Sequence, residues 1–404
     1  MATSKTPALL FIFITLLIDV IGFGLIAPVL PSLLEQLTGK DLSKVSQLGG
    51  LLMFTYAGMQ FLFSPIIGAL SDAYGRRPII LAALFAFGID FIIQGLAPSI
   101  SWFFLGRIIA GITGATFSSG TAYIADISPP EKKAQNFGLI GAAFGLGFII
   151  GPLLGGIVSF YWGVRAPFFV AASLALTNWI YGYFILPESL APENRRPFNW
   201  KRANPIGSLL HLRKYPVVSG LVGSLVTLYI ASHANHSTWS YITMNKFQWD
   251  ARMIGFSLAF VGLLTGIVQG GLTRVLIPKM GTNRAVYVGI SSYALGFLLF
   301  AFATKGWMMF AFMIPVSLGG LAMPALQGMI SNQVPANEQG EMQGALTSLV
   351  SVTSIIGPLL MTNLFAWFTG PSTPVQFPGA PFLMAAILTL ISLSLVFQML
   401  QRNK

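Results

Sequence analysis

The chain has 404 residues, of which 54% are hydrophobic and 9% are charged. A soluble domain has about 25% charged residues, so this composition excludes a water-soluble fold and predicts an integral membrane protein. Cysteine is absent, which excludes disulfides and cysteine metal sites, and the net charge of +11 lies in short loops between apolar stretches, which indicates membrane topology rather than nucleic-acid binding.

Twelve long apolar stretches follow one another along the chain, separated by Gly, Pro and charged residues. About 20 apolar residues are enough to cross a bilayer as a helix, so we expect twelve membrane-spanning helices. The expected spans are residues 8–34, 47–69, 78–97, 102–125, 136–159, 166–186, 215–240, 253–277, 285–304, 307–331, 340–367 and 380–400. The first span contains Asp19 and lacks a small-residue cleavage site, which favours a retained helix over a signal peptide.

The distribution of positive charge sets the expected orientation. With both termini in the cytoplasm, most Lys and Arg residues of the loops fall on the cytoplasmic side of the membrane. The longest polar stretch, residues 187–214, is rich in Pro and basic residues and predicts a cytoplasmic linker. We expect this linker to join an N-terminal six-helix bundle at residues 1–186 to a C-terminal six-helix bundle at residues 215–404.

The second half of the chain repeats the first. Gly151-Pro152 recurs as Gly357-Pro358, an offset of 357 − 151 = 206. Three further pairs match at the same offset: Ile124 and Ile330, Pro129 and Pro335, Gly138 and Gly344. Two related halves within a membrane are typical of secondary transporters. The expected fold is therefore all-α, with twelve transmembrane helices in two pseudo-symmetric six-helix bundles.

A turn rich in glycine and arginine joins the second and third spans. The pattern GxLxDxxGRR is formed there by Gly68, Leu70, Asp72, Gly75, Arg76 and Arg77. Glycine permits a tight turn, and an acid can interact with helix ends or with neighbouring arginines. The pattern resembles motif A of the major facilitator superfamily, in which this loop is part of the gate that closes the cytoplasmic side. An ordinary basic turn is the alternative, and the corresponding loop from Gly271 to Arg284 contains no acid.

Asp126 lies at the cytoplasmic end of the expected fourth span. An acid at the C-terminus of a helix is unfavourable unless it is paired. We therefore expect Asp126 to pair with Arg76 or Arg77 and to belong to the same cytoplasmic gate.

Small residues recur every four positions in the fifth span. They are Gly147, Gly151 and Gly155, followed by Gly156 and accompanied by Pro152. Small residues at this spacing let helix backbones pack closely in lipid, and the proline allows a bend. The segment resembles motif C, the signature of the antiporters of the same superfamily; a general small-residue packing face is the alternative.

Three ionisable side chains lie inside the spans of the first half: Asp19, Asp90 and Arg107. A carboxyl at membrane depth is often neutral and can gain and release a proton, so we expect Asp19 and Asp90 to couple transport to protons or to contact the substrate. A permanent hydrogen bond to a neighbour such as Gln94 or Asn178 is the alternative. Arg107 opens an RxxxG pattern that resembles motif B, whose arginine is linked to proton transfer; the alternative is an arginine that reaches the outer membrane interface.

The seventh span is unusually polar. His233 and His236 share a helix face, and imidazoles titrate near neutral pH. With Asn235 they are expected either to line a cavity or to mark an interfacial helix end, while a zinc site is not expected because no carboxylate is near in sequence. Further cavity candidates are the uncharged polar residues Gln60, Gln269, Tyr293 and Gln327, for which helix–helix hydrogen bonding is the alternative.

Over nearly its whole length the chain resembles the tetracycline/proton antiporter branch of the superfamily. Residues 18–31, 106–116, 144–147, 255–258 and 324–328 carry this resemblance. It implies that functional positions of the branch are occupied here by Asp19, Asp72, Arg76, Asp90 and Arg107. In one respect the chain departs from the branch. Members of the branch have an essential aspartate in the ninth span, whereas this chain has Tyr293 at that position and no acid in the span. Proton coupling or metal–tetracycline binding is therefore expected to differ.

The expected function is export of an amphipathic small molecule in exchange for protons by alternating access, with a tetracycline-like drug as the first candidate. The proton gradient supplies the energy, and neither a cofactor nor a metal nor enzymatic activity is expected. The resemblance implies a monomer in the bacterial inner membrane. A proton-coupled importer of a folate-like or other organic anion is the first alternative. A membrane receptor or enzyme is the second, and no nucleophile–base pair, metal motif or signalling domain in the sequence supports it.

Overall fold

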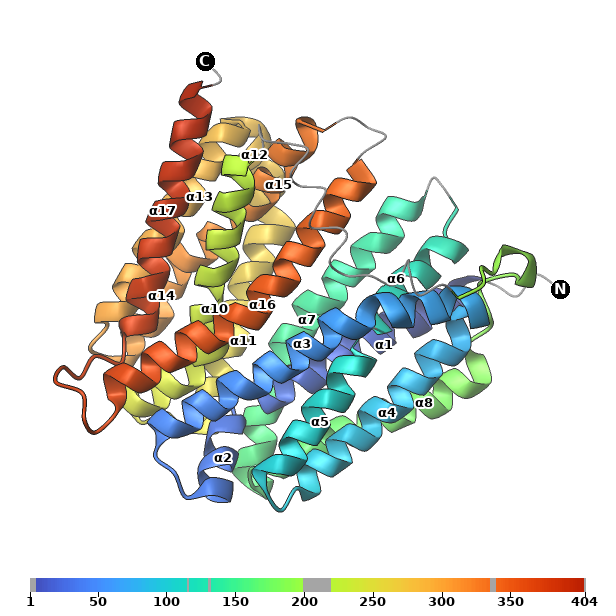
Figure 1. Cartoon of the computed structure of the whole chain (residues 1–404), viewed down its shortest axis with the longest axis horizontal. Helices are drawn as coiled ribbons and strands as arrows, with labels where there is room; N and C mark the ends of the chain where they lie inside the picture. Colours follow the sequence, from blue (N-terminus) through green and yellow to red (C-terminus); the bar gives the residue numbers. More distant parts are fainter. Residues whose placement is uncertain (1–4, 115, 130–131, 199–218, 335–338, 403–404) are drawn as a thin grey trace. The chain divides into compact units, whose positions relative to one another are not determined.

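The computed structural model describes residues 5–114, 116–129, 132–198, 219–334 and 339–402, and the regular structure of these residues is helical (Figure 1). The first half contains α1 (Lys5–Ile26), α2 (Leu30–Thr38), α3 (Leu42–Tyr74), α4 (Arg76–Leu96), α5 (Ile100–Thr113), α6 (Thr116–Ile127), α7 (Lys133–Trp162) and α8 (Ala166–Ile185), and a 3₁₀ turn, η2 (Pro192–Asn194). The second half contains α10 (Ser219–Phe247), α11 (Ala251–Ile267), the π-helix η5 (Val268–Leu272), α12 (Thr273–Met280), α13 (Thr282–Phe302), α14 (Gly306–Leu318), the 3₁₀ turn η6 (Gly319–Leu321), α15 (Ala322–Asn332), α16 (Gln339–Thr369) and α17 (Ala380–Arg402).

In its described residues, every predicted span is largely helical. Eleven helical stretches of the described chain are long and apolar enough to cross a membrane. The predicted seventh span corresponds to α10, which is not among these eleven. Its 29 residues reach about 43 Å at 1.5 Å per residue, so its length suffices, but Ser, His, Asn and Thr residues make it less apolar. The predicted all-helical membrane fold is confirmed.

The first and seventh predicted spans differ from the observed helices in ways that matter for the site. The first span is interrupted, because α1 ends at Ile26 and α2 begins at Leu30; Pro28 between them has no backbone N–H to donate to a helix. The seventh span continues to Phe247 instead of ending at residue 240. The polar segment around His233 and His236 therefore lies inside α10, and the alternative that it marks the end of a helix is excluded.

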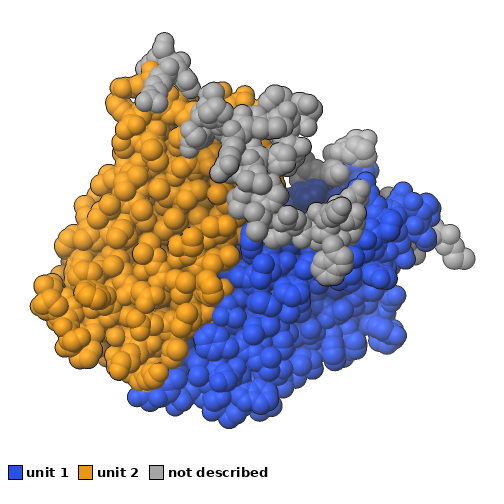
Figure 2. Space-filling model, in the orientation of Figure 1, with its two compact units in different colours: residues 1–39, 55–204, 251–259 blue, residues 40–54, 205–250, 260–404 orange. Residues whose placement is uncertain are grey.

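Residue contacts divide the chain into two compact units (Figure 2). Unit 1 comprises residues 1–39, 55–204 and 251–259, and unit 2 comprises residues 40–54, 205–250 and 260–404. The start of α3 thus belongs to unit 2 and the start of α11 to unit 1. The bundle limits at residues 186 and 215 remain a prediction, and residues 199–214 of the predicted linker lie outside the described residues.

The helices of the two units pair in the same pattern. In unit 1, α1 packs on α7 and α8, and α4 packs on α5 and α8. In unit 2, α10 packs on α16 and α17, and α13 packs on α14 and α17. The offset of 206 also joins two turns, since 281 − 75 = 206, and both Gly75 (φ 105°) and Gly281 (φ 81°) have the positive φ that glycine tolerates. The internal repeat predicted from the sequence is therefore present in the helix packing and in the turns.

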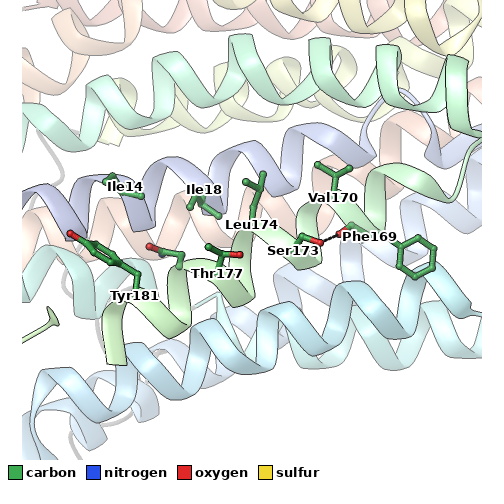
Figure 3. Close-up of a pocket in the computed structure, with 9 residues that line it drawn as sticks. Ile14, Ile18, Phe169, Val170, Ser173, Leu174, Thr177 and Tyr181 are labelled. Atoms are coloured by element: carbon green, nitrogen blue, oxygen red, sulfur yellow. Dashed lines mark hydrogen bonds between the residues drawn. The ribbon is translucent and has the colours of Figure 1, made fainter. Parts of the chain in front are cut away.

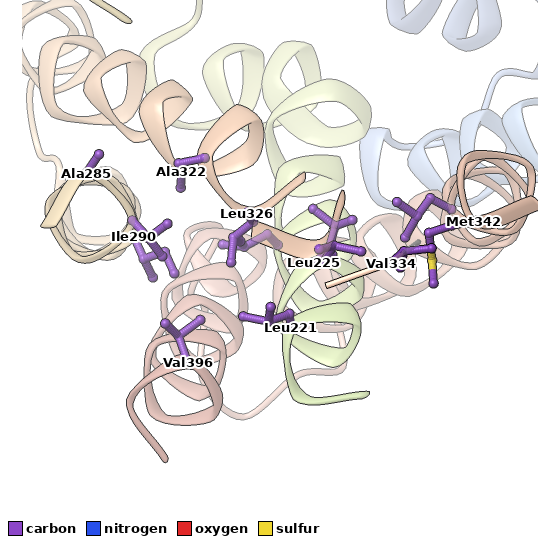
Figure 4. Packing of buried hydrophobic residues seen from close by; sticks show 14 residues of the cluster. Leu221, Leu225, Ala285, Ile290, Ala322, Leu326, Val334, Met342 and Val396 are labelled. Carbon is purple, nitrogen blue, oxygen red and sulfur yellow. The ribbon is translucent and has the colours of Figure 1, made fainter. Parts of the chain in front are cut away.

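Each unit has its own apolar core. In unit 1, Phe11 and Leu16 of α1 meet Ile80 and Leu84 of α4 and Tyr123 of α6. The unit 2 core joins α10, α13, α15, α16 and α17, and Figure 4 shows its side chains converging from these helices. Lipid tails are as apolar as these side chains, so the cores stabilise the fold through close packing rather than through burial from water.

The glycine-rich face of α7 packs directly on α1. A Cβ at Gly147 would lie 2.6 Å from Val20 Cβ, a Cβ at Gly151 would lie 2.7 Å from the carbonyl oxygen of Ile21, and a Cβ at Gly155 would overlap the carbonyl oxygen of Leu25. Side chains larger than hydrogen therefore cannot be placed there without moving the backbone of α1. The close helix approach predicted from the glycine spacing is confirmed, whereas an antiporter role for this face remains a prediction.

Candidate functional site

A chain of hydrogen bonds connects α4 and α5 inside unit 1. Gln94 Nε2 donates to Asp90 Oδ2 at 2.6 Å, and Arg107 Nη2 donates to Gln94 Oε1. Asp90 and Gln94 are completely buried. A glycine at position 106 makes room for this arrangement, because a Cβ there would lie 2.6 Å from Asp90 Oδ1. The sequence alternative in which Asp90 is bonded to Gln94 is thus observed, but the bond is itself linked to Arg107.

Arg107 lies deeper in the helix than the sequence suggested. α5 begins at Ile100, so Arg107 is seven residues (107 − 100) or about 10 Å along its axis. Its guanidinium donates inward to Gln94 instead of following its own helix to the interface. This geometry favours an electrostatic role for Arg107 beside Asp90 over the interfacial alternative.

Tyr56 and Gln60 of α3 complete this group of polar side chains. The Tyr56 hydroxyl is hydrogen-bonded to the Gln60 side chain and lies within electrostatic range of Asp19, Asp90 and Arg107. Gln60 Nε2 also donates to the carbonyl oxygen of Gly114 at 3.2 Å, at the C-terminal end of α5. We define the four-helix polar cluster as Asp19, Tyr56, Gln60, Asp90, Gln94 and Arg107. Tyr56 was not identified from the sequence.

Asp19 is the member of the cluster with an open carboxyl. It is half-buried, and within the described residues no hydrogen bond or ion pair is found for it. Asn178, which the sequence offered as a possible partner, instead donates to Thr15 Oγ1 at 2.9 Å. The Asp19 carboxyl is therefore available for a proton or a ligand.

A second charged group lies at the turn between α3 and α4. Arg76 forms ion pairs with Asp72 (Nη1 to Oδ1, 2.6 Å) and with Asp126 (Nε to Oδ2, 3.2 Å), and it donates to Ser71 Oγ at 3.2 Å. The predicted pairing of Asp126 with Arg76 is confirmed. Arg77 is not part of this pairing: its Nη2 donates to the carbonyl oxygen of Tyr183 at 2.7 Å. Gly68, the first residue of the pattern, has open space around the position of a Cβ. Steric packing therefore does not explain why this position is a glycine.

Glu188 ties the segment after α8 to this turn. Its carboxylate accepts hydrogen bonds from the backbone N–H groups of Arg76 (2.8 Å) and Arg77 (3.2 Å), the first residues of α4. It also accepts from the backbone N–H groups of Ser189 and Leu190. A carboxylate at the N-terminus of a helix satisfies free N–H groups and interacts favourably with the helix dipole. Glu188 was missed in the sequence, where it appeared as one polar residue of a linker.

We expect replacement of Glu188 by glutamine to destabilise the turn between α3 and α4. Loss of a helix-capping carboxylate costs about 1 kcal/mol, which corresponds to a fall of roughly 2 °C in the unfolding temperature of a protein of this size. Thermal unfolding of the purified protein in detergent measures this change. Glu193→Gln is the matched control, since Glu193 is an exposed acid of the same segment. Equal unfolding temperatures for both variants would contradict the capping role.

An apolar groove of about 490 Å³ lies between α1 and α8 (Figure 3). Its walls include Ile14 and Ile18 of α1 and Phe169 and Leu174 of α8. None of its lining residues is charged. It therefore lacks a carboxyl or an imidazole for proton coupling, and the four-helix polar cluster is the stronger candidate site in unit 1.

The polar residues of unit 2 form a separate set. Gln327 Nε2 of α15 donates to the Tyr229 hydroxyl of α10 at 3.2 Å. Tyr293 of α13 packs on Gly319 of η6, where a Cβ would lie 2.5 Å from the Tyr293 ring. Gln269 lies in the π-helix η5, an element that frequently marks functional sites. The structure thus supports helix–helix hydrogen bonding for Gln327, the alternative from the sequence, and the π-helix was not predicted.

The family model of the Major Facilitator Superfamily matches residues 12–319 and 281–403. The chain belongs to the major facilitator superfamily. It is 39% identical over 386 residues to the class C tetracycline resistance protein of Escherichia coli, covering 96% of this chain and 95% of that protein. It is 36% identical to the class G tetracycline resistance protein of Vibrio anguillarum, with 94% of each chain covered.

Solved transporter structures agree with this assignment. The human organic anion transporter MFSD10 (TETRAN) matches with a TM-score of 0.70 at 25% identity, over 98% of this chain and 100% of that one. A bacterial homolog of the human lysosomal transporter Spinster matches with a TM-score of 0.78 at 14% identity, over 99% of this chain and 98% of that one, which shows the shared fold alone. The predicted superfamily is confirmed, and the protein is a membrane transporter of small molecules.

Within this facilitator, the structure brings together only part of the predicted site. The three ionisable residues of the first-half spans, Asp19, Asp90 and Arg107, all lie within electrostatic range of Tyr56 in unit 1, and Gln60 bonds to Tyr56. The gate residues Asp72, Arg76 and Asp126 form a separate group. The functional roles of all these residues remain predictions.

Proposed function

We propose that this facilitator exports an amphipathic, tetracycline-like molecule in exchange for protons. The relatives named as tetracycline resistance proteins, which share more than a third of their residues with it across nearly their whole length, support this substrate class. The observation that carries the proton coupling is the four-helix polar cluster. In it a buried carboxyl (Asp90) is linked through Gln94 to one fixed cation (Arg107), and an open carboxyl (Asp19) lies within electrostatic range of Tyr56 in the same cluster.

In this proposal, Asp19 and Asp90 bind protons or the substrate alternately. A carboxyl at membrane depth is costly as an anion. It therefore holds its proton until a cationic group or water stabilises the carboxylate. Arg107, through Gln94, biases Asp90 toward release of its proton. Coupling requires that proton and substrate favour different states of the transporter. Asp72, Arg76 and Asp126 lock the cytoplasmic side in one of these states.

Several further properties belong to the same proposal. The protein acts as a monomer in the bacterial inner membrane with both termini in the cytoplasm, as the placement of basic loops indicates. It catalyses no chemical reaction, and its energy comes from the proton gradient without a cofactor. A resident metal is not part of this proposal.

Transport into liposomes tests the exchange and its direction. With purified protein in liposomes whose lumen is acidic, we expect tetracycline to accumulate inside as protons leave. One proton exchanged per molecule allows about tenfold accumulation for each unit of pH difference. Protein-free liposomes with the same gradient are the control. Accumulation only when the outside is acidic would identify a proton-coupled importer, and no proton-dependent flux of any tested drug would contradict the proposal.

A further inference from the structure

The membrane helices of the second half lack acidic residues. Residues 219–247, 260–334, 342–369 and 380–401 contain no Asp or Glu. In the first half, by contrast, Asp19 and Asp90 lie inside membrane helices. Among the described residues of unit 2, His233 and His236, in the middle of α10, are therefore the side chains at membrane depth that become cationic by taking up a proton.

The two imidazoles lie side by side, and one has a defined free nitrogen. The ring centroids of His233 and His236 are 6.2 Å apart. His236 Nδ1 lies 2.9 Å from the carbonyl oxygen of Ser232. A carbonyl oxygen only accepts, so Nδ1 carries the hydrogen and Nε2 of the neutral ring is an acceptor. When the ring is protonated, Nε2–H becomes a donor. Because the His236 side chain is exposed, this donor can reach a ligand.

A duplicated glycine makes room for the other ring. A Cβ at Gly357 of α16 would overlap Cδ2 of His233. The equivalent glycine of the first half, Gly151, instead meets the backbone of α1 at Ile21 and Gly24. The same position of the repeat thus accommodates a backbone in unit 1 and an imidazole in unit 2. This difference places His233 firmly against α16 beside His236.

In the described part of the helices that pack on α10, the membrane-spanning residues include no acid to face these histidines. The described residues of α15, α16 and α17, which pack on α10, include no charged or titratable side chain at residues 322–332, 342–369 and 380–401. The other titratable side chains of α10, of residues 42–54 of α3 and of α13 are Tyr229, Tyr241, Lys246, Lys44, Arg284, Tyr287 and Tyr293. A protonated imidazole without a carboxylate partner is costly at membrane depth. An anionic ligand can remove that cost.

We propose that His233 and His236 bind an oxyanion of the transported molecule and take up a proton when they do so. The proposal rests on the proposed function and narrows its substrate to amphipathic molecules with an ionisable oxygen, such as a carboxylate, enolate or phenolate. Proton binding and anion binding then strengthen each other, because thermodynamic coupling is reciprocal.

Uptake of two different substrates distinguishes loss of the histidine site from a general loss of transport. Tetracycline has an ionisable oxygen, whereas ethidium is a cation without one. We expect His236→Gln and His233→Gln to reduce tetracycline uptake into acidic liposomes about tenfold, the effect of losing one charge-assisted hydrogen bond, and to leave ethidium uptake unchanged. His211→Gln removes the third histidine of the chain as the matched control. Unchanged tetracycline uptake, or an equal loss for both substrates, would overturn the proposal.

A binding measurement decides the question even if wild-type protein transports neither substrate, an outcome that would refute only the proposed function. The chain has only three histidines, so nitrogen-15 labelling of histidine gives a simple NMR spectrum in lipid nanodiscs, assigned with the glutamine variants. We expect saturating tetracycline or carboxyfluorescein to raise the pH at which His236 titrates by about one unit, which corresponds to tenfold tighter binding to the protonated form. No change with either anion, or the same change with ethidium, would overturn the proposal.

Discussion

Replacing Asp19 by asparagine is expected to abolish proton-driven transport while leaving the protein folded. Asparagine has nearly the same shape but cannot gain or release a proton. Within the described chain the Asp19 carboxyl has neither a hydrogen bond nor an ion pair to lose, so the fold should tolerate the change. An ionised carboxyl at membrane depth costs about 2.5–3.5 kcal/mol, and each 1.4 kcal/mol is a factor of ten. We therefore expect uphill tetracycline uptake to fall by roughly two orders of magnitude.

The control for this experiment is an acid outside the cluster. Asp41 is exposed and lies just before α3, so Asp41→Asn should transport normally. Exchange of tetracycline without a gradient should persist in Asp19→Asn, because exchange needs no proton transfer, and its persistence also shows that the variant is folded. Normal uphill uptake by Asp19→Asn would remove Asp19 from the coupling residues and leave Asp90 as the carboxyl that couples transport to protons.

Features of the fold that depend on local composition were predictable from the sequence. Apolar length identified every span, including α10, whose polar residues keep it out of the most apolar set. The glycine spacing in α7 predicted its close contact with α1. The interruptions inside spans were not predictable in this way. The π-helix η5 and the 3₁₀ turn η6 depend on tertiary contacts such as that between Gly319 and Tyr293, which no local pattern reports.

In the candidate site, too, contacts within one helix were predictable from the sequence and contacts between distant segments were not. Asp90 and Gln94 are four residues apart on one helix, so their hydrogen bond follows from helix geometry. The contact between Arg107 and Gln94 depends on how α5 packs against α4. Tyr56 gave no signal because aromatic residues make up 13% of the chain. Glu188 gave none because its partners are backbone N–H groups from a turn more than a hundred residues earlier.

Replacing Arg107 by leucine is expected to reduce uphill transport by at least tenfold. Leucine fills similar space but leaves Gln94 Oε1 without its donor and Asp90 without a nearby cation. The loss of one charge-assisted hydrogen bond in a buried group is worth about 1.5–3 kcal/mol, or a factor of roughly ten to a hundred. Arg107→Lys should restore only part of the activity, because a compact ammonium cannot reproduce the planar guanidinium donor. Uphill tetracycline uptake at saturating substrate measures both variants.

A double-mutant cycle with Gln94 distinguishes the two roles considered for Arg107. If Arg107 acts on Asp90 through Gln94, then Gln94→Leu removes the same connection, and the double variant should lose little more activity than either single variant. If Arg107 only anchors α5 at the membrane interface, the two losses should add, and Arg107→Lys should transport normally because lysine also reaches the interface. The hydrogen bond from the guanidinium to Gln94 favours the first result. Additive losses would place Arg107 outside the coupling cluster and leave the two carboxyls without a fixed counter-charge on α5.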